Sequence, residues 1–113
     1  MADVDDRRHI YLTPVRAERA DDFEAWLRTT LMPAVRKVQP ESEPRQQTLR
    51  AIEESDGVVY FAFVLEGGDS ADWEIGPLLQ QALGDKAAER EDEAWDRMVA
   101  GDQLGGTFRT LEL

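Results

Sequence analysis

The stretch GVVYFAFVLEGG, residues 57–68, places eight consecutive apolar or aromatic residues between glycines. Successive side chains of a β-strand point to opposite faces of its sheet, so a strand built from this stretch is apolar on both faces. An antiparallel sheet with one face in water normally alternates apolar and polar residues. The stretch therefore predicts a central strand that needs a cover on each side.

The segments around this strand carry the patterns of further strands and helices. Alternation of apolar and polar residues predicts strands, whereas apolar residues spaced three and four apart predict helices. In chain order we expect a strand at 9–15, a helix at 20–38, strands at 46–53 and 57–68, a helical region at 69–83 that is interrupted at Gly76–Pro77, a helix at 85–100 and a strand at 107–113.

Prolines and glycines set the boundaries of these elements. Pro14 is expected to end the first strand, and Pro33 is expected to kink the first helix one turn earlier, near Thr29 and Thr30. The dipeptide at residues 56–57, Asp-Gly, is typical of a tight hairpin turn. The second and third strands should therefore be antiparallel neighbours, and the mixed polarity of the second suggests a sheet edge.

The element order, β-α-β-β-α-β, is that of the ferredoxin-like α+β fold. It predicts one four-stranded antiparallel sheet in the order 4-1-3-2, with both helical regions on one face and the apolar strand at the centre. Burying each large apolar side chain of the uncovered face contributes about 1.5–3 kcal/mol. We therefore expect a second copy of the sheet to cover that open face in a closed two-fold homodimer.

The composition fits a single domain over residues 1–113, with an ordered core from about residue 9. The net charge of −11, from 24 acidic and 13 basic side chains, argues against binding to nucleic acid or to a membrane surface. There is no cysteine, and no stretch approaches the roughly 20 apolar residues of a membrane span. Residues 1–8 also lack the apolar segment of a signal peptide. We expect a cytoplasmic protein.

Several features together resemble the dimeric α/β-barrel superfamily, in particular its antibiotic-biosynthesis-monooxygenase-like members. They are a short first strand, the segments FEAWL (residues 23–27) and LMP (residues 31–33), a hairpin into an aromatic-rich strand, a broken second helix and a closing strand. The resemblance covers nearly all of residues 9–113 and implies two sheets paired as a barrel, with a cavity between sheet and helices in each subunit. Members include cofactor-free quinone-forming monooxygenases, haem-degrading enzymes, isomerases and proteins without known activity.

We expect neither a cofactor nor a metal ion. The haem-degrading members use an Asn, a Trp and a His, and this sequence contains no Asn. A mononuclear metal site needs three or four converging ligands. No His-x-His or His-x-x-x-Glu spacing begins at His9, the only histidine.

Four residues on predicted strands are candidates for catalysis. His9, Tyr11 and Tyr60 are suited to handle protons, and Arg109 is suited to orient an oxyanion. Tyr60, in the middle of the apolar stretch, needs a hydrogen-bond partner if its hydroxyl is buried and is the first pocket candidate. The plainer alternatives are a strand-end histidine partly in solvent and an arginine on the surface.

Arg50 and Trp73 are the candidates for a ligand pocket. Arg50 lies on the predicted edge strand, where a surface ion pair is the alternative. Trp73 opens the second helical region and is suited either to a lid over a cavity or to an anchor for its loop. The acidic run at 89–93 is interpreted as the solvated face of the last helix. Strand register decides which side chains share a face.

Two functions remain open at this point. The first is a cofactor-independent monooxygenase or isomerase-like enzyme that acts on a small aromatic or polyketide-type substrate, as the resemblance implies. The second is a non-catalytic module that binds a small apolar ligand or a partner. Both predict a homodimer, and the lining of a pocket between sheet and helices distinguishes them.

Overall fold

The computed structural model describes residues 6–113, so the expectations for the first five residues lie outside the described part. One antiparallel sheet has the order β2-β3-β1-β4, which confirms the predicted ferredoxin-like α+β fold and its central apolar strand. The strands are β1 (Arg7–Arg16), β2 (Gln46–Arg50), β3 (Val58–Glu66) and β4 (Leu104–Arg109).

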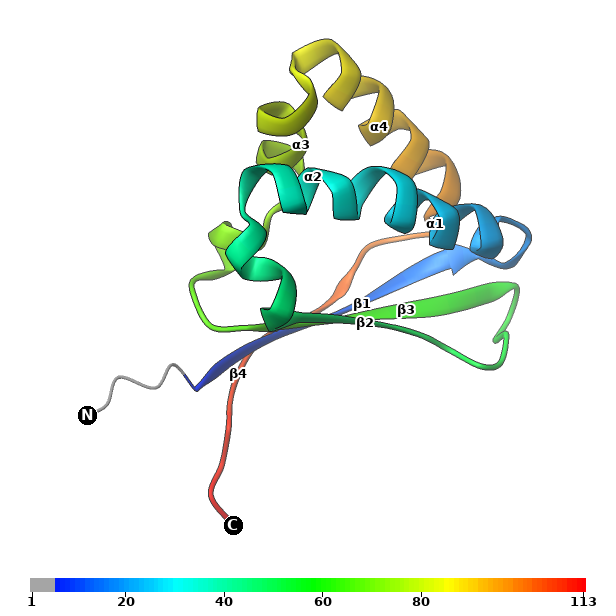
Figure 1. The fold of residues 1–113 in the computed structure, drawn as a ribbon. Helices are drawn as coiled ribbons and strands as arrows, with labels where there is room; N and C mark the ends of the chain where they lie inside the picture. The colour runs from blue at the N-terminus through cyan, green and yellow to red at the C-terminus, as the bar shows by residue number, and fades with distance from the viewer. Residues whose placement is uncertain (1–5) are drawn as a thin grey trace.

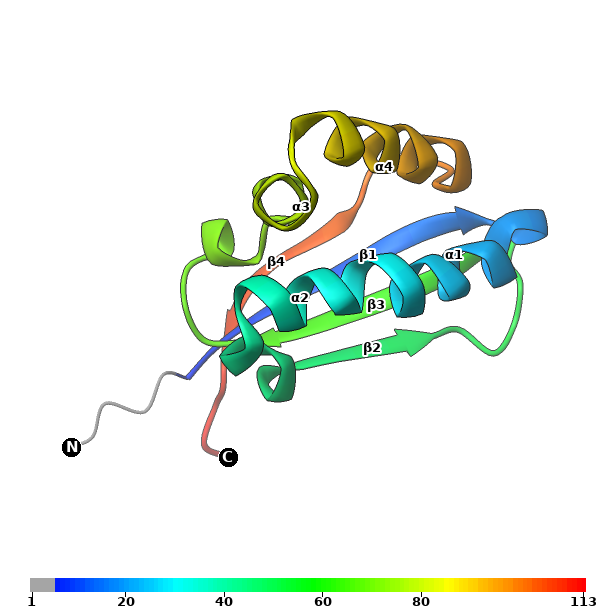
Figure 2. The same ribbon diagram turned by 45° about the horizontal axis from the view of Figure 1, so that its top comes forward.

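All helices lie on one side of this sheet (Figure 1). Helices α1 and α2 run along one flank and α3 and α4 along the other, and α2 packs against α3 (Figure 2). Within residues 6–113, none has both the length and the apolar character that crossing a membrane requires. The helices are α1 (Ala20–Trp26), α2 (Met32–Val38), α3 (Ile75–Leu83) and α4 (Asp85–Met98), with 3₁₀ helices η1 (Ala17–Arg19), η3 (Pro40–Arg45) and η4 (Ser70–Trp73) and the π-turn η2 (Leu27–Leu31).

The register of the sheet assigns every strand residue to a face. Odd-numbered residues of β1 and β3 share one face, because His9 pairs with Leu65 and Tyr11 with Phe63. This face points toward the helices, since most of its side chains are buried (His9, Thr13, Val15, Val59, Phe61, Phe63, Leu65). The even-numbered residues form the opposite face, which the described chain leaves uncovered and which we call the open face. Tyr60 belongs to it and is 36% exposed. In β1 and β3, odd-numbered residues therefore face the core and even-numbered residues form the open face.

The first strand does not end at Pro14 as predicted but continues to Arg16. Its pairing with β4 stops at Leu12 and Leu104, whereas its pairing with β3 continues to Arg16. The carbonyl of Pro14 accepts a bond from the amide of Ala100 at 2.7 Å on the β4 side. The nitrogen of Pro14 faces this same side, beyond the point where β4 pairs with β1. Its missing N–H therefore removes no hydrogen bond between β1 and β3.

The kink predicted before Pro33 is present as a π-turn. Helix α1 ends at Trp26, the turn η2 spans Leu27–Leu31, and the amide of Met32 bonds to the carbonyl of Leu27. A proline cannot donate to the carbonyl four residues earlier, and the wider turn absorbs that loss. The prediction of one interrupted helix is confirmed.

The hairpin between β2 and β3 turns at residues 56–57 as predicted, but β2 is shorter than expected. Asp56 and Gly57 have φ of 52° and 78°, the left-handed values of a tight two-residue hairpin turn. Continuous pairing with β3 ends at Arg50 and resumes only at the bridge between Ser55 and Val58 beside the turn, and Ile52 between them is fully exposed. The strand predicted to residue 53 therefore stops three residues earlier.

The second helical region breaks at a different place than predicted. Helix α3 starts at Ile75, so the interruption falls at Glu74 and not at Gly76–Pro77. Pro77 occupies the first turn, where amide hydrogens have no partner within the helix. Gly84 has φ of 86° and separates α3 from α4 as expected. Asp85, a residue type that commonly caps helices, is instead the first residue of α4, and no side-chain bond caps this helix.

Strand β4 was predicted at 107–113 but lies at Leu104–Arg109. Gly105 has φ of 150°, and a side chain there would collide with the carbonyl oxygen of Ile10 and lie 2.9 Å from the Cα of Tyr11. This glycine lets β4 approach β1 closely. After Arg109 the chain leaves the sheet on the side away from the helices (Figure 1).

Candidate functional site

A cleft of about 910 Å³ lies between the helix-facing side of the sheet and the helices, and we call it the sheet–helix pocket. Tyr11, Phe63 and Leu65 form its floor on β1 and β3. Tyr11 reaches it because β1 turns odd-numbered residues toward the helices. Most of its walls and rim come from four kinds of side chain: aromatic (Trp26, Trp73, Trp95), aliphatic (Leu31, Val35, Ile75, Leu78, Leu79, Ala88), amide (Gln39, Gln46, Gln80, Gln103) and acidic (Glu74, Asp85, Glu89, Glu91, Asp92).

The helices that form the pocket are held by a packed aromatic cluster. Phe23 of α1 meets Phe61 of β3 and Trp95 of α4 edge-on, with ring centroids 4.8 and 5.3 Å apart. Trp26 and Trp95 are also edge-on at 5.7 Å, and both line the pocket. One side of this cluster is therefore core and the other side is pocket wall.

Two hydrogen bonds fix polar side chains at the pocket. Trp26 donates its indole N–H to Oε1 of Glu91 at 3.4 Å, and Gln103 donates from Nε2 to Oγ1 of Thr13 at 2.8 Å. The Tyr11 hydroxyl has no bond to another described residue. The pocket thus contains a phenol and a carboxylate on an aromatic background.

His9 is buried, at 1% exposure, and does not line the pocket. Its Nε2 is 3.1 Å from the carbonyl oxygen of Gly67 and 2.9 Å from that of Gly68, and its Nδ1 is 2.8 Å from Oγ1 of Thr107. Carbonyl oxygens only accept, so Nε2 carries the proton and, in the neutral ring, the Thr107 hydroxyl donates to Nδ1. Both ring nitrogens are engaged, and His9 ties β1 and β4 to the turn after β3.

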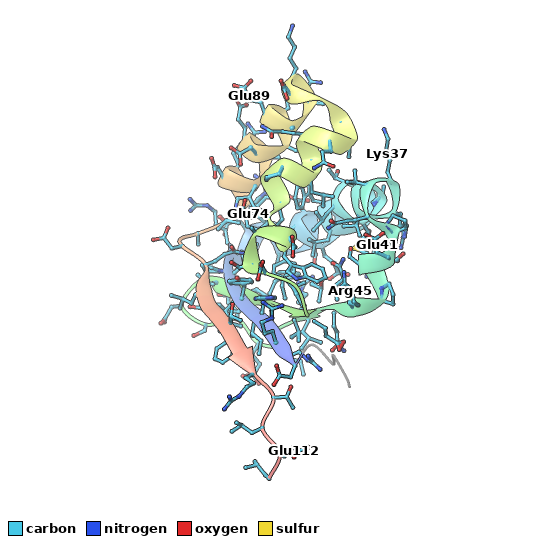
Figure 3. All side chains as sticks on the ribbon, turned by 90° about the vertical axis from the view of Figure 1, so that its left-hand side faces the viewer. Lys37, Glu41, Arg45, Glu74, Glu89 and Glu112 are labelled. Atoms are coloured by element: carbon cyan, nitrogen blue, oxygen red, sulfur yellow. The ribbon has the colours of Figure 1, made fainter. Side chains whose placement is uncertain are left out.

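Trp73 lines the pocket from η4 and is tied to the same turn. Its indole N–H donates to the carbonyl oxygen of Gly67 at 2.8 Å, so this oxygen is shared with His9. The guanidinium of Arg45 lies over the Trp73 ring at 5.3 Å from its centroid. Figure 3 views the end of the molecule that carries Arg45 and Glu74. Through this shared carbonyl oxygen His9 helps to position Trp73, although His9 itself does not line the pocket.

The remaining predicted site residues lie elsewhere. Tyr60 is on the open face because β3 turns even-numbered residues away from the helices. Arg109 is exposed at the end of β4, opposite Arg7. Of the six candidates from sequence, the structure brings Tyr11 and Trp73 together at the pocket.

Arg50 is engaged in ion pairs beside a smaller cavity of about 390 Å³ under α1 and η2. Its Nη1 lies 2.7 Å from Glu24 and 2.9 Å from Asp21, and these bonds raise the pKa of its guanidinium. In turn the hydrogen bond from Arg50, followed by the charge of Arg28, lowers the pKa of the Glu24 carboxyl. Arg50 is therefore occupied by acids of the chain itself.

Glu91 is the pocket residue that the sequence interpretation overlooked. It was assigned to a solvated acidic face at 89–93, yet it is half-buried and bonded to Trp26. The signal was present: Glu91 is three residues after Ala88 and four before Trp95, the spacing of one helical face. An acid on the inward stripe of an amphipathic helix marks such a position.

Within residues 6–113 no three His, Asp or Glu side chains are grouped so that they could hold a metal ion. The polar groups at the pocket can donate, accept or move a proton, and the rings can stack on an apolar ligand.

No protein-family model and no curated protein match the sequence. Two crystal structures are similar in fold. HapK from Hahella chejuensis has 17% sequence identity and a TM-score of 0.55, covering 93% of this chain and 92% of its own. A putative antibiotic biosynthesis monooxygenase from Caulobacter crescentus CB15 has 17% identity and a TM-score of 0.51, covering 94% and 90%. The chain therefore shares its overall fold with these two proteins, and the resemblance inferred from the sequence is confirmed as far as the fold.

Proposed function

We propose that this protein binds a small hydrophobic molecule in the sheet–helix pocket. The observation that supports this is the lining: the rings of Tyr11, Trp26, Phe63, Trp73 and Trp95 all border one cleft of about 910 Å³. Ligand pockets commonly have about 300–1,000 Å³, apolar and aromatic walls and a few polar groups. The engaged nitrogens of His9 and the place of Tyr60 on the open face support binding over the catalytic set expected from sequence.

Filling the pocket is expected to abolish binding. Ala88 is buried and lines the pocket. Ala88→Leu should weaken the affinity for 2-naphthylmethanol, a neutral aromatic probe, by at least about tenfold, because the added branches occupy the probe's space. Isothermal titration calorimetry measures it. Ala87→Leu is the matched control, since Ala87 precedes it on α4 and is not among the lining residues. Equal affinities in the two variants would contradict the assignment.

A cofactor-independent monooxygenase or isomerase acting on a small aromatic or polyketide-type substrate is the second candidate. Two observations favour it: the fold similarity to a putative antibiotic biosynthesis monooxygenase, and the Tyr11 phenol in the pocket. Such a reaction needs a group that moves a proton next to the substrate. Of the expected catalytic residues, Tyr11 is the one this candidate uses. Oxygen uptake in the presence of an anthrone, lost in Tyr11→Phe, separates it from binding alone.

We further propose that the protein forms a homodimer through its open face. Large apolar side chains from every strand are exposed there (Leu12, Leu49, Tyr60, Leu104, Phe108). They align across the sheet, because Leu12 pairs with Ala62 of β3 and with Leu104 of β4. A self-complementary apolar sheet face fits a closed two-fold interface.

The location of the protein in the cytoplasm also stays a prediction.

Charging the open face is expected to separate the dimer. Leu12→Glu places two carboxylates in the centre of the proposed interface, and light scattering at micromolar concentration should then report a monomer. Leu83→Glu is the control, because Leu83 is similarly exposed, 43% against 40%, but lies on α3. It should remain a dimer. A monomeric unsubstituted protein would refute the proposal.

A further inference from the structure

The charged side chains that line the sheet–helix pocket are all of one sign. Five carboxylates border it, and no Lys, Arg or His of the described chain is among the lining residues. Apart from the Arg45 guanidinium over the Trp73 ring, every charge near the pocket repels an anion and attracts a cation. The lining therefore indicates the charge of the ligand. This inference rests on the proposed binding function.

These five carboxylates form no ion pair within the described residues, so no basic side chain there neutralises them. Elsewhere Glu24, Glu43, Glu66 and Asp69 each lie within 4 Å of an arginine nitrogen. The acids are also not arranged to hold a metal ion, since no group of three suitable side chains occurs in residues 6–113. An organic cation fits this distribution better than a metal.

Glu91 is the pocket acid that is hydrogen-bonded to the aromatic wall. It lies between Ala88 and Trp95 on the inward face of α4, and its Oε1 accepts the bond from Trp26. Its other carboxylate oxygen has no bond to a described residue. The Trp26 and Trp95 rings meet edge-on beside it, 5.7 Å apart. A carboxylate next to tryptophan rings is the combination that attracts alkylammonium groups, through charge and through cation–π interaction.

We propose that the sheet–helix pocket takes an aromatic or apolar molecule that carries a protonated amine, with Glu91 as the carboxylate that meets the ammonium group. The apolar body lies on Tyr11, Phe63 and Leu65, and the amine points toward Trp26 and Trp95. The exposed acids at the rim, Asp85, Glu89 and Asp92, raise the local concentration of cations. Neutral molecules of the same shape bind more weakly, and anions more weakly still.

Three probes with one aromatic body test this proposal: 2-naphthylmethylammonium, 2-naphthylmethanol and 2-naphthoate. Titrated calorimetrically at pH 7 into the protein, the ammonium is expected to bind about tenfold more tightly than the alcohol, and the carboxylate less tightly than the alcohol. Glu91→Gln keeps an oxygen that accepts the Trp26 bond but removes the charge. It should reduce the ammonium affinity by about tenfold and leave the alcohol affinity unchanged within about twofold.

Glu93→Gln is the matched control, because it changes the net charge equally from an exposed position on α4 outside the pocket. It should leave all three affinities unchanged. Equal losses in Glu91→Gln and Glu93→Gln would trace the preference to overall charge and overturn the proposal. Equal binding of ammonium and alcohol would overturn it too while leaving the hydrophobic pocket standing. If none of the probes bound, the proposed binding function itself would fall.

Discussion

Replacing Phe23 with alanine is expected to lower the free energy of unfolding by about 3–5 kcal/mol, the range for aromatic truncations in protein cores. Phe23 is 0% exposed and joins three elements, because its ring contacts Phe61 of β3, Trp95 of α4 and Trp26 of its own helix α1. Truncation leaves a cavity between the sheet and two helices. Urea unfolding at one fixed protein concentration measures the change, since dimerisation would make stability depend on concentration.

Phe23→Leu is the control for this change. Leucine keeps much of the buried apolar volume but loses the edge-on ring contacts, so a smaller loss is expected. A loss below about 1 kcal/mol for the alanine variant would mean that the helices rest on the sheet through other contacts. The alanine variant should also bind hydrophobic probes less tightly, because Trp26 and Trp95 would lose the ring that holds them at the pocket wall.

Gly105→Ala is expected to lower the free energy of unfolding by about 2–5 kcal/mol, the sum of backbone strain and overpacking. The new methyl group would collide with the carbonyl of Ile10 and would lie 2.9 Å from the Cα of Tyr11. These neighbours are backbone atoms, which cannot move aside as a side chain can. Because the pairing of β4 with β1 is disturbed beside Tyr11, the pocket floor should change as well.

The adjacent residue supplies the control. Gly106 has open space around the position of a Cβ, so Gly106→Ala should alter stability by less than about 1 kcal/mol. Chemical denaturation of both variants, with hydrogen exchange of the β1 and β4 amides, measures the difference. Similar stabilities for the two variants would contradict the close approach of the strands.

The sequence allowed the fold to be predicted where local pattern and topology agree. The eight apolar residues from Val58 to Leu65 required a central position, and the sheet order places β3 there. Pro33 indicated an interruption of the first helix, and the π-turn η2 lies where that interruption was expected. Boundaries that depend on distant contacts were mispredicted. Strand β1 continues past Pro14 because β4 does not run beside that residue. Strand β4 begins before its predicted start because Gly105 fits closely against β1.

The candidate site was harder to predict, for a physical reason. Strand alternation places His9 and Tyr11 on one face, yet of these two only Tyr11 borders the pocket, because the turn at Gly67–Gly68 covers His9. No local pattern reports which part of a face a distant turn covers. Glu91 was predictable from helical spacing, but the acidic residues around it concealed its position on the inward stripe.

The chain contains three tryptophans, and all three border the same cleft. When tryptophan is excited selectively, the intrinsic fluorescence of the protein therefore originates at the sheet–helix pocket, and Tyr60 on the open face does not contribute to it. Emission wavelength and quenching should respond to any occupant without an attached dye, so crude metabolite fractions can be screened in the cuvette. An unfolding curve followed by fluorescence, for the same reason, records the opening of the pocket, and a second probe is required to follow the sheet.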